Sequence, residues 1–437
     1  MTSSTPASLR VIIIGAGTGG LALAHALIQA GINVRVFERD RTKQNERGGY
    51  RVGISPAGSR ALKACVPASV YDLFVATSAR PPRTFNMLTE NFEELLCMTF
   101  DTDAMDGEHN VIRQTLRRVL LTGLSEHVTF DKTFIGYDSN PDASVTVRFE
   151  DGSWETGDVL IGADGAGSHV RRQRLPQARH EDTGIVSLGG RLPMTDESKA
   201  LLTDKMFYGM SMIMAPKGFG AIIHSLEFTP NRADPDFMAR WPEFESSIAD
   251  DSIGWGLWAA RQNLPCDPAT LDAQELLQLA QELTRTWHLH LQQLIRMTDP
   301  STMQTIAIRT SVPPSPWESS NVTLLGDAVH TMTPGRGAGA NTALRDAQLL
   351  CKKLVDVRDG RMPLIEAIHA YEAEMLRYSS EAVIESRKNM NAGDAIHKPF
   401  VGRLQLAAMR TAMRVVNAVP PLNRRITRNI MRVRGAN

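Results

Sequence analysis

The stretch RVIIIGAGTGG (residues 10–20) decides the fold of this 437-residue chain. Its β-branched apolar run at 10–14 predicts a buried strand, and LALAHALIQA (21–30) has the apolar spacing of a helix that ends at Gly31. The sequence NVRVFE (33–38) then predicts a second strand. Together these segments predict a βαβ unit with a glycine-rich turn between its first strand and its helix.

Three glycines and one acid give this turn a specific chemistry. Gly15 permits a tight turn, Gly17 lets the backbone approach a pyrophosphate, and Gly20 allows the helix to pack closely. The free N–H groups at the start of the helix attract anionic phosphate. Glu38, at the end of the second strand, can accept both hydroxyls of a ribose. The turn predicts a dinucleotide site, but it does not by itself distinguish NAD from FAD.

Buried-strand patterns recur far along the chain, so the dinucleotide domain is predicted to be discontinuous. DVLIGADG (158–165) and VTLLGDAVH (322–330) have the pattern, and the region between about 182 and 312 changes character. The predicted fold class is α/β, a Rossmann-like domain interleaved with a substrate domain on a mixed or antiparallel sheet, followed by C-terminal helices. The predicted boundaries are 8–75, 105–181 and 315–394 for the first domain, 76–104 and 182–314 for the second, and 395–437 for the helices.

Composition narrows the class of partner. The chain has 48 basic and 48 acidic side chains, which argues against nucleic acid and favours a small-molecule substrate. The N-terminus lacks a secretory pattern and no apolar run reaches about 18 residues, so a cytoplasmic location without a transmembrane segment is expected. The four cysteines have no spacing typical of a zinc site or a disulfide framework, and they are Cys65, Cys97, Cys266 and Cys351.

The segment 395–437 is strongly basic, with nine Lys or Arg and no Asp or Glu. A helix pair with a solvated basic face is the simpler interpretation. The apolar residues of LQLAAM and MRVVNAV leave open a peripheral contact with a membrane or a partner. Residue types do not specify an oligomeric state.

Two later motifs distinguish FAD from NAD. DVLIGADGAGSHVRR (158–172) and VTLLGDAVHTMTPGRGAGANTALRDA (322–347), with Arg113 in VIRQTLRRVLL, make the chain resemble the para-hydroxybenzoate hydroxylase family of single-component FAD monooxygenases. The tetracycline-inactivating and fungal secondary-metabolite branches are the most similar. The resemblance covers roughly residues 10–60, 110–175 and 315–350.

The resemblance implies roles for further residues. Asp327 is expected to bind the ribityl chain, and the glycines after Pro334 to let the backbone lie against the flavin ring near Ala340 and Asn341. Arg51 lies in a segment that relatives place beside the flavin, although Tyr50 and Arg51 depart from their small-residue pattern. The remaining expected cofactor contacts are Arg39, Arg113, Asp164, Gly337 and Gly339.

In the central region the candidates are fewer. Arg191, in GIVSLGGRLPM, matches an arginine that faces the active site of some fungal relatives, and a cation there could hold a phenolate or carboxylate. Those relatives pair it with a tyrosine on a later strand, where AIIHSLEF offers His224 as a candidate acid or base. Met210, Met212 and Met214 alternate along a predicted strand, as sheet core or as a soft apolar substrate surface.

The leading hypothesis is therefore an FAD-dependent monooxygenase with NAD(P)H as a transient co-substrate. It would use O2, through a flavin hydroperoxide, to hydroxylate or epoxidise a small apolar organic substrate, in secondary metabolism by analogy. The alternatives are a flavin oxidase, dehydrogenase or halogenase on the same scaffold, or a non-catalytic nucleotide-binding regulator. No metal site is expected.

Overall fold

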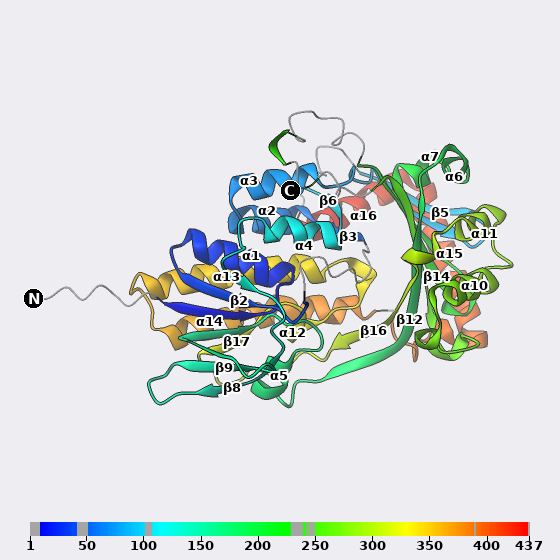
Figure 1. Ribbon diagram of the computed structural model, residues 1–437. Coiled ribbons are helices and arrows are strands. Elements are labelled where there is room, and N and C mark those ends of the chain that lie inside the picture. The colour runs from blue at the N-terminus through cyan, green and yellow to red at the C-terminus, as the bar shows by residue number, and fades with distance from the viewer. Residues whose placement is uncertain are drawn as a thin grey trace, which may run out of the picture.

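A computed structural model describes residues 9–41, 51–100, 107–228, 239–241, 244, 250–388 and 390–435. Figure 1 shows two layers: a sheet with its helices on the left, and a second, upright sheet on the right. The segment 48–50, which precedes Arg51, and residues 1–8 lie outside the described residues. In the part of the chain that is described, no helix is long and apolar enough to cross a membrane.

The first layer is built on a five-stranded parallel sheet. The order is β17-β11-β1-β2-β7, with β1 at Arg10–Ile14, β2 at Asn33–Phe37, β7 at Val128–Thr129, β11 at Val159–Gly162 and β17 at Val322–Leu324. Helix α1, Thr18–Gln29, connects β1 to β2. The predicted βαβ unit is confirmed, as is the discontinuity, because β17 pairs with β11 from a distant part of the chain.

Helices and two small sheets complete this layer. The helices are α2 (Pro56–Cys65), α3 (Ala68–Ala76), α4 (Arg113–Leu121), α5 (His169–Arg174), α12 (Asp327–His330), α13 (Gly339–Arg358) and α14 (Leu364–Ser386). The small sheets pair β3 (Arg51–Ile54) with β6 (His109–Ile112), and β8 (Phe134–Ser139) with β9 (Val145–Phe149) and β10 (Trp154–Gly157).

The second layer is a seven-stranded mixed sheet. Its order is β16-β12-β15-β14-β13-β4-β5, with β4 at Thr84–Thr89, β5 at Glu94–Thr99, β12 at His180–Pro193, β13 at Gly209–Met214, β14 at Gly220–Leu226, β15 at Ser252–Ala260 and β16 at Gln304–Ser311. Among the strand pairings described within this second sheet, only β4 with β13 is parallel. The short helix α7, Asp204–Phe207, precedes β13.

The two faces of this sheet differ. The outer face carries buried Ile213, Ile223 and Trp255 and packs in one core with residues of α10, Ala273–Leu283, and α11, Leu289–Arg296. The inner face carries the residues that alternate with these along each strand, and it looks toward the first layer (Figure 1). At its β13-β4-β5 end the inner face packs against the C-terminal helices α15, Pro399–Ala418, and α16, Pro420–Val433. The short helix α6 spans Asp196–Ala200.

Candidate functional site

The glycine turn has the geometry that each glycine was predicted to provide. Gly15 has φ +109°, and a Cβ atom there would lie 2.4 Å from the Ala163 carbonyl oxygen. A Cβ on Gly20 would lie 2.2 Å from the Gly15 oxygen, whereas a Cβ on Gly17 would meet nothing within 4 Å. Helix α1 has no acidic residue in its first turn and no side-chain cap. Its first N–H groups therefore have no capping side chain, which suits the binding of an anionic pyrophosphate.

Glu38 lies directly beside this turn. Its Oε2 accepts a hydrogen bond from the Ala16 N–H at 2.8 Å, and its Oε1 accepts one from Asp40 N–H at 3.0 Å. Arg117, which the sequence reasoning missed, approaches Glu38 at 3.3 Å and donates to the Ala16 carbonyl at 3.0 Å. Arg117 follows Arg113 by one helical turn, and this spacing could have indicated that both arginines lie on the same side of the helix. The ribose contact of Glu38 stays a prediction.

Asp327 is positioned by a sharp turn at Gly326, which has φ +64°. The carboxylate is exposed, and it accepts no hydrogen bond from the residues that the structure describes, so it is not an ordinary helix cap. Desolvation by the surrounding protein raises the pKa of this carboxyl group, while the charges of His330 and Arg113 oppose the increase. An uncommitted carboxylate in such a place is suited to bind hydroxyl groups of a ligand.

A buried hydrogen-bond network lies behind Asp327. Asp346 accepts bonds from the Gly326 N–H at 2.9 Å, from His330 Nε2 at 2.6 Å and from the Tyr378 hydroxyl at 2.5 Å. Burial disfavours the charged imidazole, but Asp346 raises the pKa of His330 above its usual value. The network fixes the end of β17 against α13 and α14, and so fixes the peptide that precedes Asp327.

The loop from Pro334 to Asn341 is held by the Asn341 side chain. Its Oδ1 accepts from the Ser55 N–H at 2.8 Å, and its Nδ2 donates to the carbonyls of Gly53 at 3.0 Å and Gly337 at 2.8 Å. The contact of the Asn341 side chain with the flavin stays a prediction, and the structure shows that this amide ties β3 to the start of α13. Helix α13 begins at Gly339. Ala340 is half-buried beside it.

The motif at residues 158–172 is anchored to α12. Asp164 Oδ2 accepts from the backbone N–H groups of His169 at 2.7 Å and Val170 at 3.3 Å, while its buried Oδ1 lacks a partner among the described residues. Arg171 donates to the carbonyls of Ala166 and Ala328, both at 3.0 Å. Arg39 is exposed, and its charge reaches His169.

These observations fit FAD. The space over Gly17 suits the pyrophosphate, the exposed Asp327 carboxylate suits the ribityl hydroxyls, and Asp164 offers an unpartnered oxygen in the loop between them. All three lie at the carboxyl ends of parallel strands β1, β11 and β17, where open α/β sheets bind their ligands.

On the inner face of the second sheet, Arg191 and His224 lie in one cross-strand row. Arg191 pairs in register with Gly254, and Gly254 pairs with His224. A Cβ on Gly254 would lie 2.5 Å from His224 Nε2, so the imidazole lies directly over this glycine, on the same sheet face as Arg191. Gly189 and Gly256, one row further along the same face, carry no side chain.

The electrostatics of this row distinguish the two side chains. Arg191 is half-buried, burial lowers the pKa of its guanidinium, and no described residue accepts a hydrogen bond from that group. For His224, burial together with the charges of Arg51 and Arg191 lowers the pKa to about 3. The imidazole is therefore neutral at physiological pH. This favours a hydrogen-bonding function over the proton transfer that the sequence had suggested.

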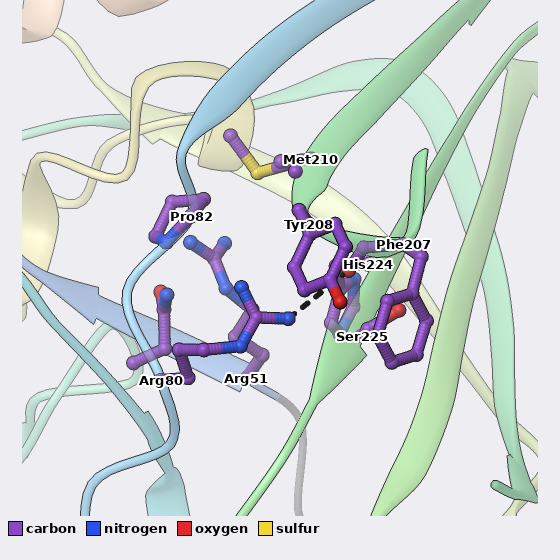
Figure 2. A pocket seen from close by; sticks show the side chains of 10 residues that line it. Arg51, Arg80, Pro82, Phe207, Tyr208, Met210, His224 and Ser225 are labelled. Atoms are coloured by element: carbon purple, nitrogen blue, oxygen red, sulfur yellow. Dashed lines mark hydrogen bonds between the residues drawn. The ribbon is translucent and has the colours of Figure 1, made fainter. Parts of the chain in front are cut away.

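Arg51 extends from β3 to the same sheet. It lines a cavity of about 10 Å³ together with Arg80, Asn110, His224 and Ser225, enough for about one water molecule. Figure 2 shows the guanidinium groups of Arg51 and Arg80 near Tyr208 and His224. Burial lowers the pKa of Arg51 to about 10, and its predicted FAD contact stays a prediction.

Three buried polar atoms belong to residues lining this cavity and have no partner in the described part of the chain: Asn110 Oδ1, Ser225 Oγ and His224 Nδ1. Arg80, Asn110 and Gly254 were not found by sequence reasoning, because no motif marks them and only the pairing of distant strands brings them together.

Comparison with known proteins places the chain among flavoproteins. Residues 8–55 and 259–386 match the family described as FAD binding domain. A dual O-methyltransferase/FAD-dependent monooxygenase of Cercospora beticola is 34% identical over 84% of this chain and 44% of its own length. The chain thus spans less than half the length of that relative.

Solved structures agree in fold. A candidate FAD-containing monooxygenase from Photorhabdus luminescens has a TM-score of 0.77 and 33% identity, over 88% of this chain and 98% of its own. The Klebsiella pneumoniae protein HpxO, solved with FAD and uric acid, has a TM-score of 0.76 and 23% identity, over 98% of this chain and 97% of its own. The second likeness shows the fold alone.

Proposed function

We propose that this chain, which belongs to the family of FAD-dependent monooxygenases, uses NAD(P)H and O2 to hydroxylate or epoxidise a small apolar organic substrate. The observation that carries the proposal is the row formed by Arg191, Gly254 and His224. It lies on a half-exposed sheet face that looks toward the FAD-binding layer. A function in secondary metabolism is part of the proposal, by analogy with the fungal relatives.

The substrate would lie on this face. Gly189 and Gly256 carry no side chain there, which suits a flat ring or chain, and half-exposed Met210 and Ile222 would supply apolar contacts beside it. Methionine adapts its shape to irregular ligands. This combination supports an apolar substrate of moderate size.

Bound FAD would supply the redox chemistry that reduces O2 with electrons from NAD(P)H and transfers one oxygen atom. Arg191 would hold an electron-rich oxygen of the substrate, because its guanidinium is half-buried and has no ion pair in the described part of the chain. His224, neutral at physiological pH, would orient the same group by a hydrogen bond. The packed sheet behind them would exclude water from the reaction.

The test begins with the purified holoprotein, which should show a bound-flavin spectrum and should oxidise NAD(P)H in air in the presence of substrate. Labelled O2 should deliver one labelled oxygen atom to the product. Release of all the reduced oxygen as hydrogen peroxide, with every candidate substrate, would instead identify an oxidase and contradict the proposal. Dependence of product formation on halide would identify a halogenase.

The residue assignment has its own variants. Arg191→Ala should keep FAD but lower product formation at least about a hundredfold, since removal of one charge-stabilising group typically costs that much. Arg296→Ala, an exposed arginine on α11, serves as the matched control. Asp327→Ala should show the opposite behaviour and lose FAD. Product formation by Arg191→Ala at the wild-type rate would remove Arg191 from the mechanism.

A further inference from the structure

Helix α15 presents an apolar stripe to solvent. Phe400 is 81% exposed, Leu404 is 74% exposed and Val415 is 54% exposed, and helical spacing puts them on one side of the helix. Val401 and Val419, 53% and 42% exposed, widen the same side. We call these five residues the α15 stripe. Its members lie toward the two ends of the helix, with the exposed small residues Ala407 and Ala408 between them, whereas single exposed apolar residues are normal on protein surfaces.

The opposite side of the helix pair is already used. Met413 and Val416 of α15 and Ile426 of α16 pack against the methionine-rich core of the inner sheet face. The Arg410 side chain bonds Glu90 and the Met214 carbonyl, and Asn417 Oδ1 accepts from Cys97 N–H at 3.0 Å. These contacts fix the rotation of α15, so the stripe is held outward.

The chain segment that carries the stripe has side-chain charges of one sign. Residues 395–437 contain nine Lys or Arg and no acidic residue. Three of these cations pair with acids elsewhere, namely Arg410 with Glu90, Arg414 with Glu93 and Arg434 with Glu108. The other six have no acidic partner among the described residues, and they are Lys398, Arg403, Arg424, Arg425, Arg428 and Arg432.

We propose that the α15 stripe and these six cations dock the protein on an anionic membrane surface, with α15 lying in the plane of the interface. An apolar helix side flanked by Lys and Arg is the pattern that inserts into the headgroup boundary and attracts anionic lipid. A second copy of the chain fits less well, because a symmetric contact would set cations against cations. The mode is docking on the surface, since no described helix could span the bilayer.

The first experiment measures binding of the full 437-residue protein to vesicles by co-sedimentation. Vesicles of phosphatidylcholine with phosphatidylserine should bind the protein, whereas vesicles of phosphatidylcholine alone should bind it much more weakly. Binding should fall as salt is raised. Each substitution in the set Arg425→Gln, Arg428→Gln and Arg432→Gln should lower the partition coefficient roughly fivefold.

The second experiment tests the stripe with a matched pair. Leu404→Glu should abolish vesicle binding, while Leu289→Glu, at a position 72% exposed on α11, should bind like the wild type. Both variants should keep the wild-type flavin content and thermal stability, because neither side chain is buried. Phe400→Glu provides a second stripe variant.

Several results would overturn the docking proposal. They are failure of the wild type to bind anionic vesicles, equal binding by Leu404→Glu and Leu289→Glu, and equal binding to neutral and anionic lipid. A stripe variant that changes the oligomeric state, with no vesicle binding by the wild type, would assign the surface to a second copy. Capture of an acidic protein in the absence of lipid binding would assign it to a protein partner.

Discussion

The residue that makes the candidate site possible is a glycine. At Gly254 the neighbouring strand brings the His224 ring to 2.5 Å from where a Cβ would lie, whereas at Gly256 the nearest atom would be Ile222 Cγ2 at 3.4 Å. The two positions lie on the same strand and the same face. Only the first one is required to be glycine by the His224 side chain.

Gly254→Ala should therefore lower the free energy of unfolding by about 1–3 kcal/mol and displace the imidazole. Gly256→Ala should be neutral or stabilising by about 0.5–1 kcal/mol, because alanine loses less backbone entropy than glycine. Chemical denaturation of both variants checks this. Equal stability of the two variants would show that His224 does not occupy the space over Gly254.

The low pKa of His224 has a consequence for stability against pH. In the unfolded chain the imidazole has its ordinary pKa of 6.5, and in the folded protein burial lowers this to about 3. Between pH 6.5 and about pH 3 the unfolded state therefore binds a proton at this imidazole, whereas the folded state does not. Stability should fall as the pH is lowered through this window, by at most about 1.4 kcal/mol per pH unit.

His224→Gln should remove this contribution and flatten the decline between pH 6.5 and pH 4, as measured by denaturant midpoints. His369→Gln, at an exposed position, should keep the wild-type slope. An unchanged slope in His224→Gln would mean that the imidazole is accessible to protons in the folded state.

At the scale of elements, the junction of β1 with α1 separates two reasons for glycine. Gly20 is needed for packing, since a Cβ would lie 2.2 Å from a backbone oxygen, whereas Gly17 borders open space and has an ordinary extended backbone. The helix can therefore form without Gly17, but a phosphate cannot approach as closely without it.

Gly17→Ala should leave the stability of the apoprotein within about 1 kcal/mol of the wild type and should strongly weaken FAD binding. Gly20→Ala should destabilise the apoprotein itself by at least about 2 kcal/mol. Thermal unfolding of the apoprotein and titration with FAD separate the two effects. Wild-type FAD affinity in Gly17→Ala would move the pyrophosphate away from this turn.

At the scale of the whole molecule, the C-terminal helices join parts of the chain that are far apart in sequence. Arg434, at the end of α16, pairs with Glu108, whose side chain is 2% exposed, and Arg60 of α2 donates to the Gly435 carbonyl at 2.9 Å. Helix α15 at the same time covers the methionine-rich core on the second sheet. The C-terminal helices therefore contact both layers.

Arg434→Ala should leave the Glu108 carboxylate buried without its partner, and should cost about 2–3 kcal/mol of unfolding free energy. Arg432→Ala, which removes an exposed arginine two residues earlier, should change it by no more than about 0.5 kcal/mol. Thermal denaturation of both variants gives the comparison. A cost of the same size for both would indicate a general effect of helix charge.

The sequence by itself determined the dinucleotide-binding turn and the family. Gly15 meets a need for positive φ, Gly17 for close approach of a phosphate and Gly20 for close packing, and these local requirements leave the same pattern wherever the turn occurs. The alternation of Met210, Met212 and Met214 likewise predicted one strand face, because side chains in a strand alternate by rule. Both inferences needed only neighbours in the chain.

The tertiary structure decided what surrounds these residues. The register of β12, β15 and β14 sets Arg191, Gly254 and His224 in one row, and register depends on pairing between distant strands. The charge state of His224 depends on burial and on arginines from other segments, and the outward side of α15 depends on which residues the sheet covers. A local pattern cannot contain this information, because burial and long-range pairing are properties of the folded chain as a whole.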